Sequence, residues 1–311
     1  MRSLAAAPTR RRQDIPPGLL STPSLNGLLR AAWVDWLCIV ACWLLMARGP
    51  HWMWPLLVLL IAGRLHALGV VLHDACHMRR LPNVWQAHLL EVLAAYPITT
   101  TLVAMRYHHL RHHRHPCTAL DPYFKPGASD RWIPAIGGRV RGLIVPFAWM
   151  LRAYLGCLAY VWPGLRNAYG HAFLGDRSSR DLRDSLEIDR CLRSEWKQAL
   201  FFIALLPLLL AYPGAVVYGY VLPLCLAGLL NANRVIAEHL HRPVPDHRPA
   251  TIVSSTFTHA SNWLNDLLLY PRNIGYHAMH HLHPTTAMRC LPDLYAWYAV
   301  DSSATGGDGV P

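Results

Sequence analysis

Histidine residues gather in three short stretches of the chain, where their spacing could build a metal site. Between residues 107 and 116, five of ten residues are histidine, although the whole chain has only 19 histidines in 311 residues. A second stretch holds His73 and His77, and a third lies between residues 277 and 283. Imidazole is the commonest protein ligand for metals near neutral pH. We therefore expect the fold to bring the three stretches to one metal centre.

The spacing within each stretch favours helices that present several imidazoles on one face. Residues three and four apart share a helix face, and the histidines that follow this rule are His73, His77, His109, His112, His113, His277, His280 and His281. Eight nitrogen donors exceed the needs of one ion and suit two, with iron, zinc, copper and nickel as candidates. The chain has no Cys-x-x-Cys or His-Glu-x-x-His pattern, which argues against thiolate zinc sites and metalloproteases.

The remaining histidines fit packing or surface positions better than ligand positions. His108, His115 and His283 flank the clusters, and His66 lies in an apolar run. The isolated histidines are His51, His88, His171, His241, His247 and His259. Cys76 lies within the first cluster, but we expect it to pack rather than to bind metal.

The composition indicates a membrane protein. Hydrophobic residues make up 53% of the chain and charged residues only 15%, which is too apolar for an ordinary soluble domain. The net charge of +11 fits either nucleic acid or an anionic membrane surface. Long apolar runs favour the membrane, so no nucleic-acid partner is expected.

Four apolar segments predict two helical hairpins, each arm close to the roughly 20 residues that a bilayer requires. The segments are 31–47, 52–72, 198–212 and 214–230. We expect an all-α integral membrane protein whose other helices form a cytoplasmic cap that holds the histidines. The domain would span residues 31–300, between a basic arm at 1–30 and a disordered tail at 301–311.

Two further apolar segments are predicted to lie at the membrane surface. Residues 85–105 are expected to form a short interfacial helix. Residues 143–162 are long enough for a fifth span, but an unpaired Arg152 at their centre would be costly in lipid. Residues 175–197 are dense in charges of both signs and are expected in water.

The distribution of basic residues predicts the orientation in the membrane. Of the 29 Lys and Arg, 5 lie in the N-terminal arm, 17 within residues 73–197 and 5 within residues 231–311, whereas the hairpin turns hold only Arg48. The positive-inside rule places these basic segments on the cytoplasmic side. Both termini and all three histidine stretches would then face the cytoplasm, and a bacterial inner membrane is the expected location.

The three histidine stretches resemble the histidine boxes of the integral-membrane fatty acid desaturase family, whose superfamily also holds membrane hydroxylases and carotenoid ketolases. The family pattern of HxxxH, HxxHH and a distant HxxHH reads here as residues 73–77, 109–113 and 277–281, with 31 and 163 residues between the boxes. An Asp after the first histidine, Asp-Pro at 121–122 and His-His-Leu-x-Pro after the third box also match. The resemblance runs from about residue 33 to residue 292.

One departure leaves the subfamily open. Many acyl-lipid desaturases have Glu before the paired histidines of the third box, and some have Gln as its first residue. The present chain has Met279 and His277 at these positions.

The resemblance implies a non-haem di-iron oxidoreductase that uses O2 and an external reductant to introduce a double bond into a fatty acyl chain. It also implies a ninth ligand, His239, and suggests Asp74 and Glu238 as groups that orient imidazoles. The substrate would be a fatty acyl lipid, an acyl-CoA or an acyl carrier protein. A separate electron donor such as ferredoxin, rubredoxin or cytochrome b5 is expected, with membrane lipids as surroundings.

Two alternatives remain open. Hydroxylation or ketolation of a lipid or carotenoid would use the same di-iron centre. A membrane metal transporter or metal-storage protein is more remote, because the histidines lie on one side and the spans lack a run of polar ligands.

Overall fold

The computed structural model describes residues 14–80, 84–259 and 262–304. Helices form nearly all the regular structure of these residues, and an isolated antiparallel bridge between His239 and Thr256 is the pairing outside them. The predicted all-α class is therefore confirmed for the part of the chain that is described.

The first hairpin consists of α1 (Leu25–Arg48) and α2 (Trp54–Cys76), joined by a short turn. Ser24 caps α1 by accepting a hydrogen bond from the backbone N–H of Gly27 at 3.3 Å. Helix α1 therefore begins inside the segment expected to be a basic arm. Residues 1–13 of that arm lie outside the described part of the chain.

The second hairpin consists of α7 (Leu186–Ala211) and α9 (Leu222–Glu238), linked by α8 (Pro213–Val216) and a π-helical turn, η8 (Val217–Val221). Both long helices extend beyond the predicted apolar runs on the histidine side. The charged segment expected in water thus includes the first turns of α7, where Ile188, Cys191 and Leu192 are buried. Apolar and charged residues follow one another at helical spacing in this segment, so its apolar face can be buried while its charged face meets water.

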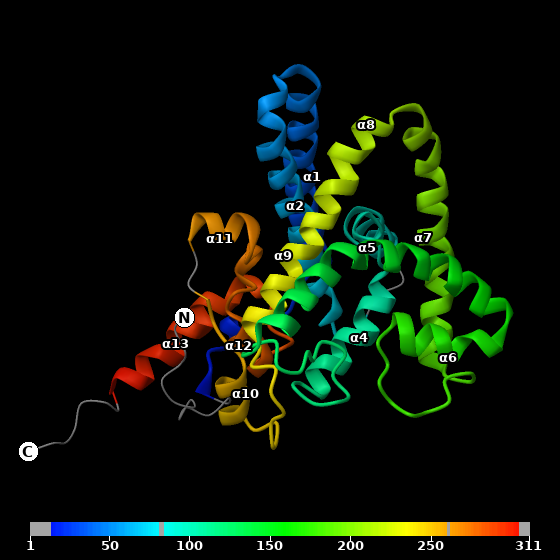
Figure 1. Ribbon diagram of the computed structural model, residues 1–311. Coiled ribbons are helices and arrows are strands. Elements are labelled where there is room, and N and C mark those ends of the chain that lie inside the picture. Colours follow the sequence, from blue (N-terminus) through cyan, green and yellow to red (C-terminus); the bar gives the residue numbers. More distant parts are fainter. Residues whose placement is uncertain (1–13, 81–83, 260–261, 305–311) are drawn as a thin grey trace, which may run out of the picture.

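A fifth helix meets the same length and composition test for a membrane span as the four predicted helices. This helix is α5 (Trp132–Val161). The sequence argument against it assumed an unpaired Arg152, and that assumption is wrong, because the Arg152 guanidinium is fully buried 2.8 Å from the Glu195 carboxylate. In Figure 1, α5 runs across the direction of the α1–α2 hairpin rather than along it. Four spans with an interfacial α5 therefore remain a prediction.

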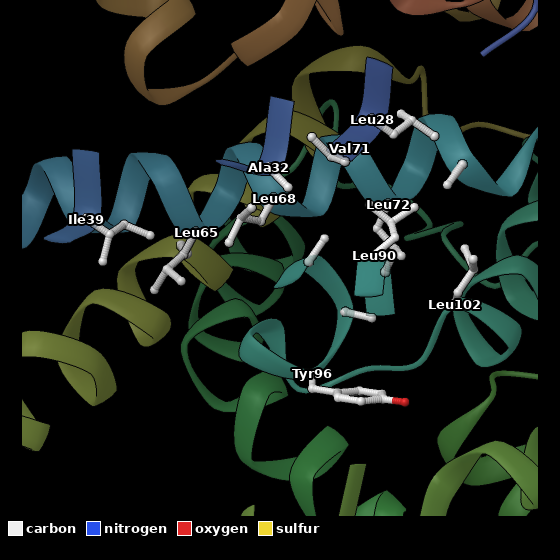
Figure 2. Close-up of a cluster of buried hydrophobic side chains, with 14 of the residues drawn as sticks. Leu28, Ala32, Ile39, Leu65, Leu68, Val71, Leu72, Leu90, Tyr96 and Leu102 are labelled. Atoms are coloured by element: carbon white, nitrogen blue, oxygen red, sulfur yellow. The ribbon is translucent and has the colours of Figure 1, made fainter. Parts of the chain in front are cut away.

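Residues 85–105 do not form the short surface helix that was expected. They form α3 (Trp85–Leu90), two short turns named η4 (Glu91–Ala95) and η5 (Tyr96–Ile98), and the start of α4 (Leu102–Arg114), with a bend of 74° before α4. Figure 2 shows Leu90, Tyr96 and Leu102 in the same apolar cluster as side chains of α1 and α2. The segment is thus packed into the core, where it sets the direction in which α4 leaves.

The C-terminal part supplies further helices, α10 (Pro249–Ser255), α11 (Trp263–Leu268), α12 (His277–Leu282) and α13 (Leu291–Ala304). A second apolar cluster joins Met279 of α12 and Leu291 and Leu294 of α13 to Val70 of α2. Helix α13 enters the segment expected to be a disordered tail, and residues 305–311 lie outside the described part.

Candidate metal centre

Five histidines from three helices converge in a first group. Helix α2 and the residue after it supply two of them, α4 supplies two and α12 supplies one; the five are His73, His77, His109, His113 and His280. One ring nitrogen from each lies within 4.8 Å of those of the others, and all are buried except the half-buried His113. The shortest contact joins His77 Nε2 and His109 Nε2 at 2.7 Å.

Four further histidines form a second group with the same spacing limit of 4.8 Å, namely His112, His239, His277 and His281, and all four are buried. Helix α4 supplies one, the residue after α9 supplies one and α12 supplies two. The rings of His113 and His281 stack at 4.4 Å between centroids, so the two groups are neighbours.

The nine residues in the two groups are the nine that the sequence and the resemblance proposed as metal ligands. The helical spacing places the members of each box on one helix face, and the fold brings the faces together. The geometry does not identify an ion, so the role of these nine residues as metal ligands stays a prediction.

The chemistry of this donor set fits metal ions. Burial, followed by neighbouring histidines, holds the pKa values of His239, His277 and His281 well below the usual 6.5. These three imidazoles are therefore neutral at pH 7, with a lone pair available to a cation. The converging ring nitrogens cannot all donate hydrogen bonds to one another, because a neutral imidazole has one N–H. Two cations, one in each group, would bind their lone pairs.

Asp121 orients His112, and the sequence argument did not assign it this role. The Nδ1–H of His112 donates to Asp121 at 2.9 Å, which leaves Nε2 to face the second group. The carboxylate also accepts backbone hydrogen bonds from Cys117 and Tyr123 at 2.9 and 2.8 Å. Burial alone would raise the pKa of Asp121, but the hydrogen bonds and His112 lower it, so the group is ionised. In the sequence, this role of Asp121 is indicated by the Asp-Pro pair at residues 121–122, which matches the family pattern.

The two acids proposed to orient imidazoles occupy different positions. Glu238 Oε2 lies 3.5 Å from His277 Nδ1, without a hydrogen bond to it, and is held by Arg234 at 2.6 Å, so its proposed role stays a prediction. Asp74 instead lines a separate cavity of about 290 Å³ and accepts a hydrogen bond from the backbone of Met288. The structure therefore gives no support for the proposed role of Asp74.

The histidines that were not predicted to be metal ligands lie outside both groups. His66 Nδ1 donates to the backbone oxygen of Leu268 at 2.8 Å, and His108 Nδ1 lies 2.9 Å from the hydroxyl of Tyr123. His283 contacts the hydroxyl of Tyr298 at 2.9 Å.

A largely apolar cavity of about 620 Å³ adjoins the first group. Its wall comes mainly from α2, α5 and α9, and His73 of the first group is part of that wall, as are His66 and His108. Volumes of roughly 300–1,000 Å³ are usual for small-molecule sites. The cavity is therefore large enough for a small apolar molecule, and His73 of the first group forms part of its wall.

Comparison with protein families matches residues 50–304 to the family described as fatty acid desaturase. The matched range includes all nine histidines and most of the described helices. Comparison with curated proteins finds no match. Because the family match covers well over half of the chain, the resemblance drawn from the histidine boxes is confirmed, and the protein belongs to the fatty acid desaturase family.

Proposed function

We propose that the protein is an O2-dependent membrane di-iron oxidoreductase that introduces a double bond into a fatty acyl chain. The observation that carries the proposal is the placement of two neighbouring groups of imidazoles, the first of which adjoins an apolar cavity. An acyl chain in this cavity would bring one methylene close to His73. The family match supports the same class of reaction.

Different residues would have different roles in the proposed reaction. The first group would hold one iron and the second group the other, and the bound pair would supply the oxidising power for attack on an unactivated C–H bond with O2 and external electrons. Asp121 would hold His112 in one orientation through its hydrogen bond, and Glu238 lies beside the ring of His277. The apolar cavity wall excludes water and positions the chain. A separate protein such as a ferredoxin, a rubredoxin or cytochrome b5 would deliver the electrons.

Hydroxylation or ketolation remains the alternative outcome at the same centre, since both begin with attack on a C–H bond. The products of the reaction distinguish the two. Metal transport is disfavoured because both histidine groups lie at one end of the helical hairpins rather than along them.

The test joins metal analysis to product analysis. We expect the purified protein to contain two irons per chain and its expression host to accumulate a new unsaturated lipid, detected by mass spectrometry. His112→Ala should lower product formation by at least 100-fold, because it removes a ligand from the second group. His115→Ala is the matched control, because His115 lies on the same stretch but outside both groups, and it should keep full activity. Purified protein that holds no iron and consumes no O2 with lipid and reductant would refute the proposal.

A further inference from the structure

Tyr123 places a phenol ring against both groups of the candidate metal centre. The ring stacks on that of His112, with 4.6 Å between the centroids and 28° between the planes. The ring of His109 lies 6.1 Å from it. His109 belongs to the first group and His112 to the second, and Tyr123 also forms part of the wall of the apolar cavity. The phenol therefore lies between the candidate metal centre and the space assigned to the substrate.

The hydroxyl of Tyr123 is hydrogen-bonded to an imidazole that is not a predicted ligand. It lies 2.9 Å from Nδ1 of His108. A phenol is a stronger acid than an imidazole N–H, and an imidazole nitrogen is the stronger base, so the hydroxyl donates. His108 is buried and belongs to neither metal group. A base at this distance is within reach to take a proton during a reaction.

The pair is held in place by groups that also hold His112. Oδ1 of Asp121 accepts hydrogen bonds from the backbone N–H of Tyr123 at 2.8 Å and from Nδ1 of His112 at 2.9 Å. His108 and His112 are four residues apart on α4, so they share one face of the helix. The loop after α4 and this helix face therefore fix the phenol, its proton acceptor and a predicted ligand relative to one another.

This arrangement is suited to the loss of one electron from the phenol. A phenol is among the side chains that are oxidised most readily, and a base that takes its proton at the same moment makes the oxidation easier still. The proposed iron centre supplies an oxidant strong enough for an unactivated C–H bond. When no substrate fills the cavity, Tyr123 is an oxidisable group in contact with that centre.

We infer that Tyr123 is a redox-active residue that reduces the O2-oxidised iron centre when the cavity holds no substrate, with His108 as its proton acceptor. Tyr123 gives one electron to the centre, its O–H bond breaks, and the proton moves to Nδ1 of His108, which leaves a neutral tyrosyl radical. One electron from the external reductant and the return of the proton restore the pair. The inference rests on the proposed function, because it needs the O2-reactive iron.

Electron paramagnetic resonance of rapidly frozen samples tests the inference by a signal rather than by activity. Reduced, iron-loaded protein is mixed with O2 in the absence of lipid. We expect a tyrosyl radical, identified by a narrower signal in protein made with ring-deuterated tyrosine. A total lipid extract of the expression host, which contains the substrate under the proposed function, should suppress the signal when it is added first. Protein that holds two irons and forms the unsaturated product, but shows no radical, would refute the inference and leave the proposed function standing.

Substitutions locate the radical. Tyr123→Phe keeps the stacked ring and removes the hydroxyl, so the signal should be lost while iron content and melting temperature stay unchanged. Tyr107→Phe is the matched control, because Tyr107 is buried on α4 and its hydroxyl donates to the carboxylate of Asp176 at 2.5 Å. This variant should keep the signal. A signal of unchanged size in Tyr123→Phe would overturn the inference.

The proton acceptor and the protective role are tested separately. His108→Phe keeps a ring beside Tyr123 but cannot accept its proton, so the signal should be lost at unchanged iron content. A persistent signal would overturn the role of His108. Repeated exposure to O2 and reductant without lipid, followed by peptide mass spectrometry, reports damage to the site. We expect more oxidation of His109 and His112 in Tyr123→Phe than in the unaltered protein, and equal oxidation in the two would contradict the protective role.

Discussion

Asp121 determines which nitrogen of His112 is free to meet a metal. Its carboxylate accepts the Nδ1–H of His112 and is fixed in turn by the backbone N–H groups of Cys117 and Tyr123. Carboxylates in this position orient the ring and raise its basicity as a ligand. The short loop after α4 therefore contributes to the metal centre although it supplies no ligand.

Asp121→Asn tests this contribution, because asparagine keeps the size of the side chain but loses its charge. Changes to such partners weaken metal affinity or activity by roughly 10–100-fold, and we expect iron affinity, measured by competition with a chelator, to fall by a factor in this range. Asp181→Asn is the control, because Asp181 is exposed and pairs with Arg183. An iron affinity unchanged in Asp121→Asn would show that the backbone alone holds His112.

Helical geometry explains why the sequence predicts the histidines of the candidate site more readily than the carboxylates that contact them. Residues i and i+4 share a helix face whatever the tertiary structure, so His73 and His77 could be paired from spacing. Neighbouring residues on a helix point roughly 100° apart, which explains why Asp74, next to His73, lines another cavity. Asp121 contacts His112 because the chain turns between the two residues, and helical spacing does not predict such turns.

At the scale of elements, contact between α5 and α9 shapes the cavity. An added Cβ at Gly142 of α5 would lie 2.6 Å from the Cβ of Ala232 and 2.7 Å from the backbone oxygen of Gly228. The two helices therefore meet backbone to backbone, as small residues permit. Residues of both helices beside this contact line the cavity.

Gly142→Ala should separate these helices. Overpacking of this kind costs about 1–3 kcal/mol, so we expect a lower melting temperature in detergent and lower activity. Gly137→Ala lies on the same helix, and its Cβ would have no neighbour within 4 Å. It should leave stability unchanged or raise it, because alanine favours helix more than glycine does. Equal melting temperatures for the two variants would contradict the tight contact.

Two of the sequence arguments failed because they depend on partners distant in the chain. Arg152 looked too costly for a membrane span because its partner, Glu195, lies on α7. Residues 85–105 looked interfacial because their composition is mixed, yet side chains from Leu90 to Leu102 pack in one apolar cluster with those of α1 and α2. The four long apolar runs each overlap a helix that is long and apolar enough to span a membrane, because hydropathy over about 20 residues is a local property.

At the scale of the whole molecule, the two hairpins point the same way. Their turns, at residues 49–53 and 212–213, lie at one end of the molecule in Figure 1, and α4, α10 and α12 lie at the other. Basic residues are concentrated at the histidine end of the chain's hairpins, in residues 73–197 and 231–311. The positive-inside rule then predicts that the histidine groups face the cytoplasm.

Cysteine labelling tests this orientation. In a variant without the eight native cysteines, Gly214→Cys places a thiol at the exposed hairpin turn, and Ser179→Cys places one on the exposed segment before α7. In a bacterial host, a membrane-impermeant maleimide should label Gly214→Cys in intact cells and Ser179→Cys only in inverted vesicles. Both variants should react after detergent treatment, which controls for access of the reagent to each thiol. The reverse pattern would place the histidine groups outside the cytoplasm, and a donor such as a cytoplasmic ferredoxin could not then reach the site.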